Sequence, residues 1–182
     1  KAEIERIRTV EIPKNNDATE LNPMDMTYLL VNPSFDEGNS NGWILDVATS
    51  GNNQSLGDAW EFWWESAENA LFDMRQPIYA LPEGKYTFSG ELAQSYNYQS
   101  SIGNEGRAFI YATVVVDGDS TTCLTPVEPQ TEDATTRHSY TVAFNVPESE
   151  SEIVVLVGVK TVGVQDARWF ACDNFTLTYY GS

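Results

Sequence analysis

The stretch HSYTVAFNV, residues 138–146, decides the fold class of this chain. Large apolar side chains alternate there with small or polar ones: Tyr140, Val142, Phe144 and Val146 are separated by Thr141, Ala143 and Asn145, with Ser139 in front. Successive side chains of a β-strand point to opposite faces, so this period of two predicts a strand with one buried face.

Similar runs recur from residue 27 to the end of the chain. They are TYLLVNPSF (27–35), KYTFSGELA (85–93), AFIYATVVVDG (108–118), EIVVLVGVK (152–160) and FTLTYY (175–180). Turn sequences such as LPEGK (81–85) and VDGD (116–119) separate them, and in the last segment Asp173, Phe175, Leu177 and Tyr179 are predicted to share a face. Eight or nine strands without interleaved helices predict an all-β protein, an antiparallel β-sandwich or jelly roll.

The tryptophan-rich stretch AWEFWWESAEN, residues 59–69, permits two interpretations. At helical spacing one face carries Trp60, Trp63, Trp64, Ala67, Leu71 and Met74. As a strand, Trp60, Phe62 and Trp64 share one face, and Trp63 lies on the other. Periodicity leaves both open, whereas the β-rich surroundings favour the strand.

Composition excludes several classes of partner. The chain has 182 residues, 27 acidic against 10 basic, and a formal charge of −17. Nucleic acids and anionic lipid surfaces are bound through clusters of Lys and Arg, so no nucleic-acid partner is expected. No apolar run of 18 residues occurs, so no membrane insertion is expected either. The polar residues 1–25 are predicted to be a linker or extension, and residues 26–182 the sandwich domain.

The two cysteines, Cys123 and Cys172, form no CxxC pair, which argues against a zinc or redox motif. They are either a disulfide of an exported protein or two buried thiols, and the sequence leaves this open.

Three stretches in order resemble the galactose-binding-like β-sandwich domains. LLVNPSFDEGNSNGW (29–43) is similar to their opening segment, FDMRQPIYALPEGKYTFSG (72–90) to their central hairpin, and WFACDNFTLTYYG (169–181) to their closing strand. Such domains occur among carbohydrate-binding modules, and the nearest likeness is to secreted or cell-surface glycan-utilisation proteins of Bacteroidetes. The sandwich hosts many functions, so the resemblance fixes no ligand.

The resemblance also implies a structural Ca²⁺ ion. Its ligands would be Asp36 and Asp173, with Asn39 or Asn41 and backbone carbonyls of the DEGNSNG loop. A loop of this composition supplies oxygen ligands readily, and Ca²⁺ takes about six to eight of them. The alternative is that Asp36 starts an ordinary turn and Asp173 accepts hydrogen bonds within the protein.

A polysaccharide or oligosaccharide is the ligand that we expect. Sugars are bound by aromatic rings against their C–H faces and by amide, carboxylate and guanidinium groups on their hydroxyls. The candidates are Trp60, Trp63, Tyr96, Asn97, Tyr98 and Arg107. Trp43 and Trp169 are expected in the core.

No catalytic motif is recognisable around the single histidine, His138, and a glycosidase would need two carboxylates facing each other across a cleft. The sequence therefore predicts a non-catalytic carbohydrate-binding module of a secreted or cell-surface protein. The alternative is a structural or protein-interaction domain that docks or spaces adjacent domains of the same protein.

Overall fold

The computed structural model describes residues 18–47, 52–55, 58–63, 72–95, 108–130, 135–161 and 169–182. Its elements are β1 (Met24–Asp25), the 3-10 helix η1 (Thr27–Leu29), β2 (Ile44–Val47), β3 (Asn52–Ser55), β4 (Trp60–Trp63), β5 (Phe72–Tyr79), β6 (Gly84–Gln94), β7 (Ala108–Val116), β8 (Asp119–Pro126), β9 (His138–Val146), β10 (Ile153–Thr161) and β11 (Trp169–Tyr179). No α-helix occurs in these ranges.

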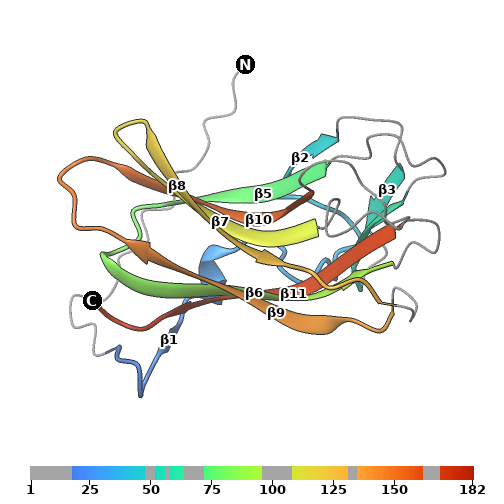
Figure 1. Ribbon diagram of the computed structural model, residues 1–182, viewed down its shortest axis with the longest axis horizontal. Coiled ribbons are helices and arrows are strands. Elements are labelled where there is room, and N and C mark those ends of the chain that lie inside the picture. Colours follow the sequence, from blue (N-terminus) through green and yellow to red (C-terminus); the bar gives the residue numbers. More distant parts are fainter. Residues whose placement is uncertain are drawn as a thin grey trace.

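The strands form two antiparallel sheets stacked face to face (Figure 1). The first sheet has the order β3-β4-β11-β6-β9, with β1 added to the edge of β11, and the second has the order β2-β5-β10-β7-β8. The predicted all-β antiparallel sandwich is therefore confirmed. Every second residue of β9 from Val142 to Val146 is buried, as the alternation of residues 138–146 predicts.

Residues 60–63 form a strand, which confirms the β interpretation for that part of the tryptophan-rich stretch. Trp63 pairs with Trp169 of β11, and Trp60 pairs with Cys172. In the helical alternative Trp60 and Trp63 would share a face, whereas in β4 they alternate between a buried and a half-exposed position. Residues 64–71 lie outside the described part of the chain.

Aromatic rings fill much of the space between the sheets. One group joins the opening loop to the two central strands: the Trp43 ring centroid lies 5.0 Å from that of Phe175, and Phe88 stacks on Phe175 at 5.1 Å. A second group forms under β4, where Phe72 lies 5.4 Å from Trp60 and 5.0 Å from Phe170. The prediction that Trp43 belongs to the core is confirmed.

The described end of the predicted extension lies on the sandwich. Strand β1 pairs with β11, so that Met24 is opposite Tyr179. Lys85 forms an ion pair with Glu20 at 2.7 Å, and Met26 is fully buried. Residues 18–25 are therefore part of the folded body, whereas residues 1–17 lie outside the described part.

The turn between β7 and β8 has the backbone conformation of a tight β-hairpin. Asp117 and Gly118 have φ values of 53° and 86°. Two successive positive φ values are the signature of a type I′ turn, whose twist matches that of the flanking strands. The prediction of a turn at VDGD is confirmed.

Candidate functional site

The alternation along β4 separates its two tryptophans. Trp60 and Phe62 point into the sandwich, and Glu61 and Trp63 point away from it. Trp60 is 0% exposed, and its ring packs on those of Phe62 and Phe72. A side chain without accessible surface has no face to offer a sugar, so the prediction of Trp60 as a ligand contact is corrected. Trp60 is a core residue.

Trp63 lies beside a second half-exposed indole. It is the direct cross-strand partner of Trp169, which opens β11. Directly opposite residues in an antiparallel pair point to the same face with their Cβ atoms about 5 Å apart, so both indoles project from the outer face of the first sheet. We call Trp63 and Trp169 the indole patch.

Trp169 was expected in the core, and the structure corrects this. In β11 the inward positions at this end are taken by Phe170 and Cys172, both fully buried. Strand alternation then turns Trp169 outward, where it is half-exposed. The signal was present in the sequence WFAC, because Phe170 and Cys172 are better core residues than the pair Trp169 and Ala171.

Polar groups lie on the next row of the same face. Gln54 of β3 is the cross-strand partner of Glu61, and its amide nitrogen donates to a Glu61 carboxylate oxygen at 3.4 Å. A carboxylate and an amide beside two indoles are the chemical groups that bind sugar hydroxyls next to a stacked ring. Two indoles, a carboxylate and an amide therefore lie on one face of the first sheet.

The other predicted ligand contacts lie outside the described residues. Tyr96, Asn97, Tyr98 and Arg107 all fall within residues 96–107, and they stay predictions. The chain enters this segment directly after Ser95. The Trp169 backbone N–H donates to the Ser95 hydroxyl at 3.1 Å, and the Ser95 N–H donates to the Trp169 carbonyl at 3.0 Å.

The predicted calcium ligands of the opening loop make turn-type hydrogen bonds. The Ser34 hydroxyl donates to Asp36 at 2.6 Å. The side-chain oxygen of Asn39 accepts from the Asn41 backbone N–H at 2.8 Å, and the Asn32 amide donates to the Asn39 carbonyl at 2.7 Å. Asp36 and Asn41 are exposed. These contacts are hydrogen bonds within the loop itself.

Asp173 occupies a different position from the one predicted. A β-bulge between Asp173 and Thr176 interrupts the alternation, and Asp173 becomes the partner of exposed Glu91. Cross-strand partners share a face, so Asp173 lies on the outer face of the sheet, opposite to Phe175. The prediction that Asp173 and Phe175 share a face is therefore wrong.

Asp173 meets a protein cation in this position. A terminal nitrogen of Arg137 lies 3.5 Å from its carboxylate, with the two side chains 13% and 7% exposed. Burial raises the pKa of Asp173; the nearby carboxylates of Glu91 and Asp36 raise it further, and a hydrogen bond from the Asn174 backbone and the charge of Arg137 oppose this. Within the described residues the other carboxylate oxygen has no hydrogen-bond partner.

The calcium ion stays a prediction. Asp36 is close enough to act on the pKa of Asp173, and the unpaired Asp173 oxygen would suit a cation. Against this, Arg137 already supplies a positive charge, and the described residues contain no group of three or more His, Cys, Asp or Glu side chains that could hold a metal. A melting temperature raised by Ca²⁺ in the native chain and not in Asp36→Asn would establish the ion.

The outer face of the second sheet carries a compensated ionic network. The Tyr111 hydroxyl donates to Asp73 at 2.6 Å, and Arg75 contacts Asp73 at 3.2 Å and Asp46 at 2.7 Å. The Lys160 ammonium lies 4.3 Å from the centroid of the Tyr111 ring. Each charge there faces a partner within the protein, so this network serves the sheet rather than a ligand.

The two cysteines, both among the described residues, are free thiols. Cys172 is fully buried in β11, and Cys123 is half-buried in β8. The two-thiol alternative is therefore the one that the structure contains.

Comparison with known proteins identifies the fold. No protein-family model matches the chain, and no curated protein matches its sequence. The carbohydrate-binding module TmCBM61, solved with β-1,4-galactotriose, is similar with a TM-score of 0.53 and 17% identity, over 83% of this chain and 97% of that one. A cyclase from Fischerella sp. TAU is similar with a TM-score of 0.57 and 12% identity, over 88% and 99%.

The enzymatically active domain of tailspike protein 4 from bacteriophage CBA120 is similar with a TM-score of 0.59 and 10% identity. The match covers 82% of this chain but only 21% of the tailspike chain. Modules of carbohydrate-binding families 4 and 16 match as well. At these identities the likeness shows the fold alone, a β-sandwich that carbohydrate-binding modules share with some enzymes. Within the part of the chain that the structure describes, no helix has the length and apolarity to cross a bilayer.

Proposed function

We propose that this chain is a non-catalytic carbohydrate-binding module of an exported or cell-surface protein, and that it binds glycans on the outer face of its first sheet. The observation that carries the proposal is the indole patch, two half-exposed indoles on directly paired residues of neighbouring strands. A rigid strand pair keeps two large rings in place at little entropic cost, and each ring stacks on the C–H face of one sugar. Likeness to carbohydrate-binding modules supports the proposal.

Glu61 and Gln54 complete the binding mode. Their side chains lie one row from the indoles. In the proposal the Glu61 carboxylate accepts hydrogen bonds from sugar hydroxyls, and the Gln54 amide both donates to them and accepts from them. Tyr96, Asn97, Tyr98 and Arg107 lie outside the described residues and stay predicted ligand contacts. Binding of this kind makes and breaks no covalent bond. The module would therefore hold a neighbouring domain, or the cell, on a polysaccharide.

Native affinity electrophoresis with xylan, galactan, mannan and mixed-linkage β-glucan tests the proposal. We expect at least one polymer to retard the native chain. Trp63→Ala and Trp169→Ala each remove one stacking ring and weaken binding about tenfold or more, which corresponds to about 1.4 kcal/mol. The matched control is Tyr79→Ala, an aromatic residue 53% exposed on the other sheet, which leaves the retardation unchanged. Retardation that survives both tryptophan variants would contradict the proposed surface.

A second candidate function is a structural or protein-interaction domain. It is favoured by the outer face of the second sheet, where Ile44, Tyr79 and Leu124 are 44%, 53% and 44% exposed. They lie singly on β2, β5 and β8, and a protein that covered this face would contact all three. If no polymer retards the folded chain and it associates with its neighbouring domains instead, this function replaces the first.

A further inference from the structure

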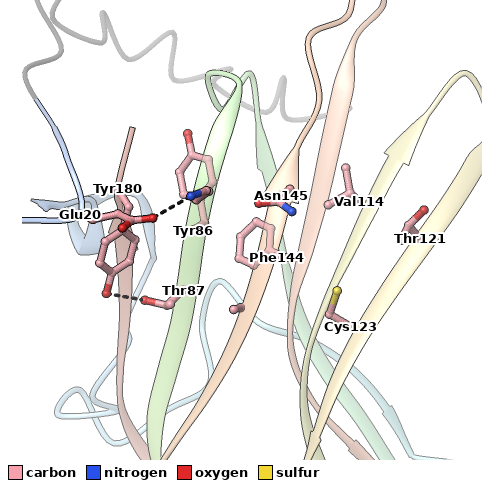
Figure 2. A pocket seen from close by; sticks show the side chains of 11 residues that line it. Glu20, Tyr86, Thr87, Val114, Thr121, Cys123, Phe144, Asn145 and Tyr180 are labelled. Carbon is pink, nitrogen blue, oxygen red and sulfur yellow. Dashed lines mark hydrogen bonds and ion pairs between the residues drawn. The ribbon is translucent and has the colours of Figure 1, made fainter. Parts of the chain in front are cut away.

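A cavity opens along the line where the edge strands of the two sheets meet. Strands β8 and β9 are joined at one end, where the Thr125 hydroxyl donates to the Thr141 carbonyl at 2.8 Å and the Glu128 N–H donates to the Tyr140 hydroxyl at 3.1 Å. Further along the same two strands, toward Thr121 and Asn145, lies a cavity of about 560 Å³ (Figure 2). Small-molecule sites in proteins have volumes of about 300–1,000 Å³.

The cavity has an apolar floor. Val114 of β7 and Phe144 of β9 line it, and both are buried members of the hydrophobic core. Figure 2 shows Phe144 between the strands that carry Tyr86 and Val114. Val114 and Phe144 are only 6% and 4% exposed, so they close the floor of the cavity and leave the more exposed groups of its rim to make most of the contact with a ligand.

The rim offers uncharged hydrogen-bonding groups. Thr121 and Asn145 project from the two edge strands and are exposed. On the far side the hydroxyls of Thr87 and Tyr180 lie 3.4 Å apart, and the half-exposed Tyr180 ring adds an aromatic wall. These groups both donate and accept, as the hydroxyls of a sugar require.

Charge at the rim is compensated. The Lys85 ammonium is paired with the Glu20 carboxylate at 2.7 Å. No other charged side chain lines the cavity within the described residues. An anion would find no unpaired cation there, and the net charge of −17 repels it further. The ligand chemistry that remains is neutral, hydroxylated and apolar on one side.

We propose that this cavity is a second binding site, which takes a neutral pyranose sugar with its hydroxyls on Thr121, Asn145 and Tyr180, above a floor that Phe144 and Val114 close. The site is independent of the indole patch. Tyr180 follows β11 and Trp169 begins it, eleven positions apart, which is roughly 35 Å at about 3.3 Å per residue. Two such sites on one domain would engage two sugars of a polymer, or two chains, at once.

Cys123 reports on occupancy of this site. Its thiol lines the cavity and is half-buried (Figure 2). The second thiol, Cys172, is fully buried, and this burial raises its pKa, so it resists alkylation in the folded protein. A bound sugar covers Cys123, whereas Cys172 serves as the internal control for unfolding.

The experiment measures the rate at which N-ethylmaleimide alkylates Cys123, by intact mass and peptide mapping, with and without the methyl glycosides of glucose, galactose, mannose and xylose. At about ten times its Kd a sugar that binds the cavity lowers this rate about tenfold by mass action. We expect saturable protection by at least one of the four, with Cys172 unmodified throughout.

Two neighbouring threonines give a matched pair of variants. Thr121→Ala removes a hydroxyl from the rim and weakens protection about three- to tenfold, the effect of one hydrogen bond. Thr122→Ala makes the same change on the opposite face of β8 and leaves protection intact. If Thr121→Ala does not fold, Asn145→Ala replaces it, because that residue is exposed.

The proposal is overturned if none of the four sugars protects Cys123 in the folded chain, or if protection is equal in the variants of Thr121 and Thr122. Trp63→Ala separates this site from the indole patch. Protection that persists in Trp63→Ala supports a second site even where polymer retardation fails. Protection lost in that variant, in a folded chain, would mean that the sugar binds at the indole patch, and it would overturn the second site.

Discussion

Trp60 and Trp63 belong to one short strand but lie in opposite environments. Trp60 is enclosed by Phe62, Phe72 and Phe170. Its indole N–H is buried and has no hydrogen-bond partner among the described residues, so this ring stabilises the fold by packing alone. Trp63 faces solvent beside Trp169. The two residues have the same chemistry, and strand parity assigns one to the core and the other to the surface.

Truncation should therefore have different consequences at the two positions. Trp60→Ala leaves a large cavity and should lower the free energy of unfolding by about 3–5 kcal/mol. Trp63→Ala removes one cross-strand contact and should cost about 1 kcal/mol or less. Urea unfolding followed by circular dichroism measures both. If both variants lost the same free energy of unfolding, Trp63 would be a core residue. That result would contradict its proposed role in binding.

Strand β7 connects the core to the ionic network of the second sheet. Its inward residues Ile110 and Ala112 are fully buried, and between them Tyr111 lies on the outer face. Tyr111 is nevertheless only 2% exposed, and it contacts Asp73 of β5 and Lys160 of β10. A single tyrosine thus links three neighbouring strands by a hydrogen bond and a cation–π contact.

The Tyr111 hydroxyl should make the stability of the chain depend on alkaline pH. Burial raises the pKa of Tyr111 above its ordinary value of 10.0, and the hydrogen bond to the Asp73 carboxylate raises it further. Above pH 10 the unfolded chain loses this proton while the native chain keeps it. The native state then binds more protons, so the free energy of unfolding falls as pH rises through this window.

Tyr111→Phe tests this dependence. At neutral pH the variant should lose about 1–2 kcal/mol, because the hydrogen bond to a charged group is gone. Above pH 10 the difference from the native chain should shrink, since the variant has no phenol to ionise. Urea unfolding across this range measures it. Tyr79→Phe, at an exposed position, should change the free energy by less than about 0.5 kcal/mol. A difference that grows with pH would refute the assignment.

The net charge of −17 acts on the molecule as one body. Most carboxylates of the described residues lie on exposed positions, and the ion pairs of Lys85, Arg75 and Arg137 compensate only a few of them. The remaining charges repel one another more strongly in the compact state than in the unfolded chain. The same charge keeps polyanions away, which suits a domain whose proposed ligands are neutral sugars.

Salt should therefore stabilise the folded chain. Raising NaCl from about 0.01 M to about 0.15 M shortens the screening length from about 30 Å to about 8 Å. We expect the free energy of unfolding to rise by about 1 kcal/mol, or the melting temperature by about 2–4 °C. Scanning calorimetry measures the shift, with neutral sucrose at equal osmolarity as the control. A melting temperature that falls with salt would mean that attractive ion pairs outweigh the repulsion.

Local pattern was enough to predict most of the sandwich. The sequence correctly predicts the strand at residues 138–146 and the turn at Asp117 and Gly118. Both features depend on only a few adjacent residues, through alternate burial in the strand and positive φ values in the turn. The site was harder to predict. Trp63 was identified and lies on an outer face, whereas Trp169 was placed in the core, although the alternation of Phe170 and Cys172 indicated otherwise.

The sequence by itself determined the all-β class, the excess of acidic residues and the buried face of the strand at residues 138–146. Each depends on the composition or on side chains two positions apart in one segment. Only the tertiary structure decided that Trp63 pairs with Trp169, that a bulge turns Asp173 toward Arg137, and that β8 and β9 enclose a cavity. These features arise from register between strands that are distant in the chain, and one residue of slip or insertion exchanges the faces of a strand.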